Sequence, residues 1–202
     1  MNQHDLNVID KIFNELKKVE NSGAVVFNTD FTKIAKTNLF LLKGLMDIEG
    51  EKGLFVSLDR PHQYMSYLLK IHDVDQDDLW FIDAVTRMSG EKSNTKGNVD
   101  FLEDAFHVGD LFDYLKEHNG EFLRIDDIDF IVIDNIATML NYNTTTKVKE
   151  FIKKFKGFTD KHPHVLAGVT IDPESNPELS EIIDELFDYK IDIKNIQEEV
   201  SR

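Results

Sequence analysis

Residues 24–39 read Ala-Val-Val-Phe-Asn-Thr-Asp-Phe-Thr-Lys-Ile-Ala-Lys-Thr-Asn-Leu. The first five, Ala24–Asn28, are short and apolar, which predicts a buried strand. From Lys36 to Ile48 the apolar residues recur at helical spacing, which predicts a helix. The stretch is therefore a strand, a short loop and the start of a helix.

The rest of the chain repeats this alternation. Apolar runs predict further strands at Leu54–Leu58, Leu79–Asp83, Phe130–Asp134, Val165–Ile171 and Tyr189–Ile193. Helical spacing predicts helices at Asp5–Val19, Pro61–Ile71, Val99–His118, residues 144–161 and Pro177–Leu186. Strands that are apolar on both faces and alternate with helices predict an α/β three-layer sandwich, with a mostly parallel central sheet between two layers of helices.

Length and composition favour a single domain over residues 1–202, with an N-terminal helix in residues 1–20. Residues 86–98 are rich in Ser, Gly, Asn and Lys, which predicts a flexible loop. No apolar run approaches the roughly 20 residues that span a bilayer, and residues 1–10 lack the pattern of a signal peptide. The chain has no cysteine, so we expect a cytoplasmic protein without disulfides or thiolate metal sites.

The formal net charge of −15 makes nucleic acid an unfavourable partner, because such a chain repels phosphate backbones. The one lysine-rich segment, Lys147–Lys161, spaces its lysines between phenylalanines. This spacing is that of a solvated face on an amphipathic helix. We expect a protein partner or self-association, and no membrane.

The loop after the first strand ends in Lys36-Thr37, as a phosphate-binding P-loop does. A P-loop has the pattern Gly, four residues, Gly, Lys, Ser or Thr. Asp30 and Ala35 stand at the two glycine positions. Three interpretations are open at this point: a nucleotide site that has lost its function, a divergent working site, or an ordinary first turn of a helix.

Acidic residues follow two other predicted strands. Asp59 comes after Leu54–Leu58, and Asp134 ends Phe130–Asp134. Ligands of parallel α/β sheets lie at the carboxyl ends of the strands. Hydrophobic residues that end in an Asp have the form of a Walker B strand, whose Asp helps to hold Mg²⁺. The alternatives are a helix-capping role for Asp59 and a loop-capping role for Asp134.

In this order the motifs resemble RecA-type ATPase domains, and most closely the KaiC-like branch found in archaea and bacteria. The resemblance rests on the P-loop position, on Gly50-Glu51-Lys52-Gly53 before the second strand, on Phe81-Ile82-Asp83-Ala84 and on Ile131-Val132-Ile133-Asp134-Asn135, and covers about residues 20–193. It implies a P-loop NTPase fold. It also implies ATP and Mg²⁺ as cofactors, with phosphate contacts at Asp30, Ala35, Lys36 and Thr37 and Mg²⁺ contacts at Thr37 and Asp134.

The sequence departs from that family at two places. The P-loop glycines, which let backbone N–H groups face phosphate oxygens, are missing. Asp59 and Arg60 stand where the family has paired acids that activate water. Arg60 stays protonated and cannot act as a base, so Asp59 is the remaining catalytic candidate.

These departures favour a degenerate KaiC/RecA-like pseudo-ATPase that does not hydrolyse ATP and acts as a regulatory or scaffolding partner. A site that binds neither ATP nor Mg²⁺ is an equal possibility. Two alternatives stay open: a divergent, active and oligomeric ATPase, and a RecA-paralogue accessory to DNA repair.

Overall fold

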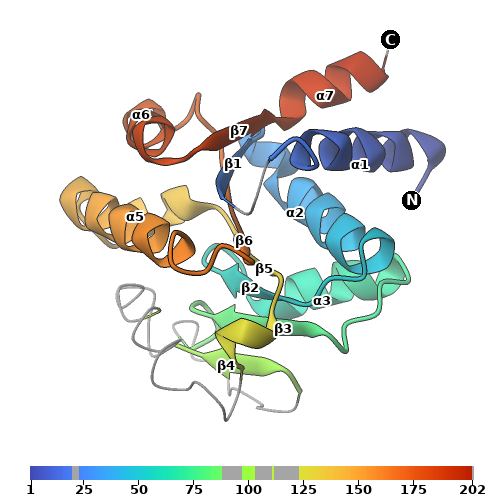
Figure 1. Cartoon of the computed structure of the whole chain (residues 1–202), viewed down its shortest axis with the longest axis horizontal. Coiled ribbons are helices and arrows are strands. Elements are labelled where there is room, and N and C mark those ends of the chain that lie inside the picture. The colour runs from blue at the N-terminus through green and yellow to red at the C-terminus, as the bar shows by residue number, and fades with distance from the viewer. Residues whose placement is uncertain (20–22, 88–96, 103–110, 112–122, 202) are drawn as a thin grey trace.

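The structure is a computed structural model of the chain, and it describes residues 1–19, 23–87, 97–102, 111 and 123–201. One seven-stranded sheet runs through it, in the order β4-β3-β2-β5-β6-β1-β7 (Figure 1). Its strands are β1 (Ala24–Asn28), β2 (Gly53–Ser57), β3 (Leu79–Asp83), β4 (Val99–Phe101), β5 (Phe130–Ile133), β6 (Leu166–Ile171) and β7 (Tyr189–Asp192). Every pair of neighbouring strands is parallel, so all the carboxyl ends lie along one edge.

Helices cover both faces of the sheet, which confirms the predicted three-layer α/β architecture. They are α1 (Gln3–Leu16), α2 (Ile34–Lys43), α3 (His62–Ile71), α5 (Thr145–Thr159), α6 (Pro177–Leu186) and α7 (Ile193–Val200). A π-helix, η2 (Gly44–Ile48), continues α2, and short 3-10 turns form η1 (Phe31–Lys33), η4 (Ile125–Asp127) and η5 (Ile136–Asn141). None of the helices in the described ranges is long and apolar enough to cross a membrane.

The two faces of the sheet carry separate cores, because successive residues of a strand point to opposite faces. Helices α1, α2, α3 and α7 pack on Val25, Phe27 and Val132. Helices α5 and α6 pack on the alternate residues, such as Val26 and Ile133. Strands buried on both faces explain why β1, β2 and β5 read as continuous apolar runs.

The Gly50–Gly53 turn has a physical explanation in the structure. Gly50 has φ of +71°, a left-handed conformation that glycine adopts without strain. A Cβ on Gly53, the first residue of β2, would lie 2.3 Å from the ring of Phe130. A side chain at this position would therefore collide with that ring. Both glycines therefore serve the entry of the chain into β2.

Two predicted elements need correction. The expected helix from Val99 is wrong at its start, because Val99–Phe101 forms the edge strand β4, paired with Phe81–Asp83. The apolar–polar–apolar order of three residues fits a strand edge as well as a helix turn, and pairing with β3 decided it. The last strand ends at Asp192, where the Asp192 side chain caps a helix, α7, that the sequence analysis missed. Most of the predicted loop, residues 88–96, and residues 103–110 and 112–118 of the predicted helix lie outside the described residues.

Candidate functional site at the carboxyl edge of the sheet

The loop between β1 and α2 is short and contains one 3-10 turn, η1. Strand β1 ends at Asn28, η1 begins at Phe31, and α2 begins at Ile34. No residue from 29 to 37 has a positive φ. The loop therefore lacks the left-handed residues by which a P-loop turns successive N–H groups toward phosphate.

Thr37 and Lys36 point to different places. Thr37 is fully buried, and its hydroxyl lies 2.9 Å from that of Thr29 in a hydrogen bond. The Lys36 ammonium instead lies 2.7 Å from the Asp5 carboxylate of α1, and 5.1 Å from the centre of the Phe40 ring. The phosphate contact of Lys36 remains a prediction, and in this conformation the ammonium is already paired.

Asp5 shows that this pairing is favourable. Burial acts to raise the pKa of its carboxyl, but hydrogen bonds from Lys36 and from the Asn2 backbone outweigh burial and hold the pKa below its ordinary value. Asp5 is thus a charged partner of Lys36 that the sequence analysis did not identify. The capping box that Asp5 forms with Asn2 could have placed Asp5 in the first turn of α1, but no signal in the sequence pairs it with Lys36.

Asp30 and Ala35 occupy the positions of the P-loop glycines. The Asp30 carboxylate pairs with Lys33 at 2.9 Å and with Lys194 of α7 at 3.5 Å. The hydrogen bond from Lys33 is the main reason that the pKa of Asp30 lies below its ordinary value. Ala35 lines a small cavity at the strand ends, beside Ile34.

Asp172, which follows β6, accepts a hydrogen bond from a backbone N–H group of the loop after β1. Its carboxylate accepts hydrogen bonds from the Phe31 N–H at 3.2 Å, from the Glu174 N–H at 3.0 Å and from the Ser175 hydroxyl at 2.5 Å. Burial acts to raise the pKa of Asp172, but these hydrogen bonds lower it overall. An internal carboxylate therefore binds an N–H group that in a P-loop would face a ligand. Asp172 was not among the predicted site residues, although it follows a predicted strand.

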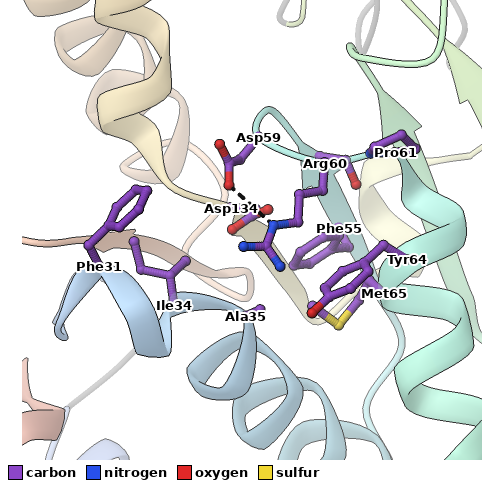
Figure 2. A pocket seen from close by; sticks show the side chains of 11 residues that line it. Phe31, Ile34, Ala35, Phe55, Asp59, Arg60, Pro61, Tyr64, Met65 and Asp134 are labelled. Carbon is purple, nitrogen blue, oxygen red and sulfur yellow. Dashed lines mark ion pairs between the residues drawn. The ribbon is translucent and has the colours of Figure 1, made fainter. Parts of the chain in front are cut away.

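Asp134 lies at the centre of the site, 6% exposed, at the end of β5 (Figure 2). It accepts a hydrogen bond of 2.5 Å from the side-chain amide of Asn38 in α2. Burial and the nearby charge of Asp59 raise the pKa of Asp134 to about 7, against the opposing effects of Asn38 and Arg60. The next residue, Asn135, has φ of +44°, and its N–H donates to the Thr170 hydroxyl of β6.

Asp59 and Arg60 lie at the mouth of the cavity. The Arg60 Nε lies 3.5 Å from the Asp59 carboxylate, and the Arg60 guanidinium lies 4.7 Å from the centre of the Tyr64 ring. Figure 2 shows the guanidinium between Asp59 and Tyr64, close to Asp134. The Thr138 hydroxyl also donates to Asp59, at 3.4 Å. Asp59 is thus near Asp134, as expected, but it is paired with Arg60.

The cavity that these side chains enclose has a volume of about 10 Å³. That is room for about one water molecule. Its lining includes Phe31, Ile34, Ala35, Asp59, Arg60, Tyr64 and Asp134. Lys36 and Thr37 are not in the lining. As placed, these residues do not fit a Mg²⁺-bound triphosphate, and over the described ranges no three His, Asp or Glu side chains are placed to share a metal ion.

No family model matches this chain, and no curated protein matches its sequence. Solved structures do match its fold. A KaiC-like protein from the hyperthermophilic archaeon Pyrococcus horikoshii superposes with a TM-score of 0.57 at 17% identity, over 85% of this chain and 72% of that one. A second protein of the same organism, crystallised with an unknown peptide, gives a TM-score of 0.68 at 12% identity, over 92% and 83%. A third protein of this organism superposes with a TM-score of 0.59 at 11% identity, over 92% of this chain and 87% of that one.

The chain therefore has the α/β fold of KaiC-like, RecA-like ATPase-fold proteins. At these identities the likeness carries the fold alone, and what the site does has to be argued from its residues.

Proposed function

We propose that this chain is a degenerate KaiC/RecA-like domain that does not hydrolyse ATP and works as a regulatory or scaffolding partner of another protein. The observation that carries the proposal is the closed site at the strand ends. Its cavity of about 10 Å³ holds no space for a triphosphate.

The side chains that would bind nucleotide have other partners. The Lys36 ammonium is held by Asp5 on α1, and the Asp134 carboxylate is held by Asn38. Opening the site would break both contacts and would leave Asp5 and Asn38 to find new ones. The half-exposed Lys36–Asp5 pair costs about 1 kcal/mol or less to break. The buried Asp134–Asn38 contact is therefore the larger part of the cost that a ligand would have to offset.

Direct binding and turnover measurements test this proposal. The purified protein is titrated with Mg²⁺–ATP by calorimetry, and phosphate release is followed in parallel. We expect no binding heat at millimolar nucleotide and no release above buffer. Lys36→Ala and Asp134→Ala are measured alongside, with Lys33→Ala as the matched control on the same loop. Micromolar binding that Lys36→Ala removes, with turnover that Asp134→Ala removes, would instead establish the divergent ATPase.

The proposed partner surface is the outer face of α3. Tyr64, Tyr67 and Ile71 are 40%, 61% and 50% exposed and lie three and four residues apart, on one side of the helix. Exposed apolar groups that gather on one face mark interaction sites. The P. horikoshii protein of similar fold that was crystallised with an unknown peptide supports a protein ligand on this fold.

A photo-crosslinking residue at position 67 tests this surface. We expect it to capture a defined polypeptide, while the same residue at the exposed position Lys153 of α5 captures none. Capture of a second copy would assign the face to self-association. The same set of products at both positions would remove the surface from the proposal.

A further inference from the structure

A second cavity lies at the opposite edge of the sheet, where the strands begin. Its volume is about 240 Å³. Asp129 precedes β5, Leu166 begins β6, and Glu51 precedes β2 by two residues. This cavity is separate from the closed site, because the two lie at opposite ends of the parallel strands.

One wall of this cavity is apolar. Phe13 and Leu16 from the end of α1, Leu45 from η2, and Leu166 from β6 line it. Phe13 and Leu45 are at most 5% exposed, so the wall is anchored in the core. Such a wall would take the hydrocarbon part of a ligand out of water.

Glu51 forms the polar side. The buried Oε2 of its carboxyl group has no hydrogen-bond partner within the described part of the chain. Its backbone N–H donates to the Leu45 carbonyl at 2.9 Å, which fixes the residue at the cavity. A buried acceptor without a partner is unfavourable unless a ligand or a proton satisfies it.

The other charged groups that face Glu51 have partners. Glu49 pairs with Lys17 at 3.2 Å. The Asp129 carboxylate accepts the Lys52 N–H at 2.9 Å, and His164 contacts the Ile125 carbonyl through Nε2 at 3.4 Å. Burial, followed by the charges of Asp129 and Glu49, raises the pKa of Glu51 to about 7. The polar side therefore has an excess of negative charge, because Glu49, Glu51 and Asp129 line the cavity together with Lys17.

We propose that this cavity binds a small organic cation, a primary ammonium on an apolar body, with the ammonium on Glu51 and the body against Phe13, Leu16, Leu45 and Leu166. The cavity is slightly smaller than the roughly 300–1,000 Å³ of drug-sized pockets, so the body is one ring or a short alkyl chain. The proposal does not depend on the function proposed for the other edge.

Three probes of one shape test the charge requirement: phenylbutylamine, phenylbutanol and phenylbutyrate. Binding is followed by the amide shifts of Glu51 and Leu166 in nuclear magnetic resonance titrations. We expect the amine to bind about tenfold or more tighter than the alcohol, and the carboxylate to bind weakest. Equal affinity for the three probes, or no binding of the amine at millimolar concentration, would overturn the proposal.

Two matched variants locate the ammonium. Glu51→Gln keeps the shape and removes the charge, and we expect the amine to bind it no tighter than the alcohol. Glu49→Gln alters the carboxylate that Lys17 already holds, and we expect the preference for the amine to persist. The amide spectrum of each variant confirms folding, and an unchanged preference in folded Glu51→Gln would assign the binding elsewhere.

The pH dependence has a definite sign. An ammonium binds the ionised carboxylate of Glu51, so affinity should fall as the pH drops below about 7, by up to tenfold per pH unit. Glu51→Gln should lose this dependence. A profile that is flat between about pH 5 and pH 8 in the parent protein would contradict the role of Glu51.

Discussion

The two edges of the sheet differ in the room that lies beside their charged groups. At the carboxyl edge Lys36 is held by Asp5, Asp134 by Asn38, and the Phe31 N–H by Asp172, and the cavity beside Asp134 has a volume of about 10 Å³. Among the described residues, the buried Asn28 Oδ1, Asn38 Oδ1 and Ser57 Oγ of this edge have no hydrogen-bond partner. At the amino edge Glu51 has an unpartnered oxygen beside a cavity of about 240 Å³.

The carboxyl edge is the usual ligand-binding edge of this kind of fold, whereas the larger of these two cavities lies at the amino edge. Parallel α/β sheets bind ligands at the carboxyl edge. Here Lys36, Asp134 and the Phe31 N–H of that edge have partners within the chain, and on the functions that we propose the amino edge, beside Glu51, is where a small ligand binds.

The largest effect is expected at Asp83, the best satisfied carboxylate of the carboxyl edge. It accepts from the His62 N–H and ring, from the Val85 N–H, and from the Thr86 N–H and hydroxyl. Burial acts to raise its pKa, but these donors hold the pKa well below the ordinary range. Asp83→Ala leaves the donors unpaired and should lower the free energy of unfolding by about 3 kcal/mol or more. Urea denaturation measures this, with exposed Asp126→Ala as the control, and a loss below about 1 kcal/mol would contradict it.

Asp134→Asn should stabilise the protein, in a pH-dependent way. The folded pKa of about 7 lies above the ordinary value of 3.8, so the native state holds a proton that the unfolded chain has released. The contribution of Asp134 to the free energy of unfolding is therefore fully present below about pH 4 and is lost as the pH rises through about 7. The variant lacks this fall, and its advantage at about pH 8 should exceed that at about pH 5 by on the order of 2 kcal/mol. Urea denaturation at the two pH values measures it, and a destabilised variant at the higher pH would contradict the account.

Glu51→Gln should act in the same direction but by less. The pKa of Glu51 is also raised to about 7, chiefly by burial. Its side chain is partly exposed, so solvent screening reduces the gain to less than about 1 kcal/mol above pH 7. Thermal unfolding at neutral and acidic pH checks the sign, and Glu49→Gln should show no comparable gain.

Lys36→Ala should have the smallest effect. The Lys36 side chain is 50% exposed, so the ion pair with Asp5 is partly screened. We expect a loss of about 0.5 kcal/mol or less in the free energy of unfolding. Asp5→Asn should give a similar loss, and the double variant should lose less than the sum. Fully additive losses would show that the two side chains do not stabilise each other in solution.

The sheet was predictable from sequence because its strands are apolar on both faces, as Ile131-Val132-Ile133 shows. Val99–Phe101 was not, because three residues at a sheet edge carry too little periodicity to separate a strand from a helix. Helix α7 was missed because Ile193 also continues the apolar pattern of the strand before it, although Ile193, Ile196 and Val200 recur at helical spacing after the capping residue Asp192.

The candidate site was only partly predictable. Sequence order correctly brought Asp59 and Asp134 to the same edge, because parallel strands end together. It did not predict that Lys36 would face α1, since that depends on Asp5, which lies 31 residues earlier in the chain. Side-chain pairing across elements is set by packing, and spacing within a motif does not reveal it.

The amide resonances of a uniformly labelled sample, followed during titration with Mg²⁺–ATP and, separately, with phenylbutylamine, compare the two edges in one experiment. We expect Mg²⁺–ATP at millimolar concentration to leave the resonances of residues 29–37 and Asp134 unshifted, and the amine to shift those of Glu51 and Leu166. Saturable shifts at Thr29, Lys36 and Asp134 with Mg²⁺–ATP would contradict this expectation, because the carboxyl edge would then open to nucleotide.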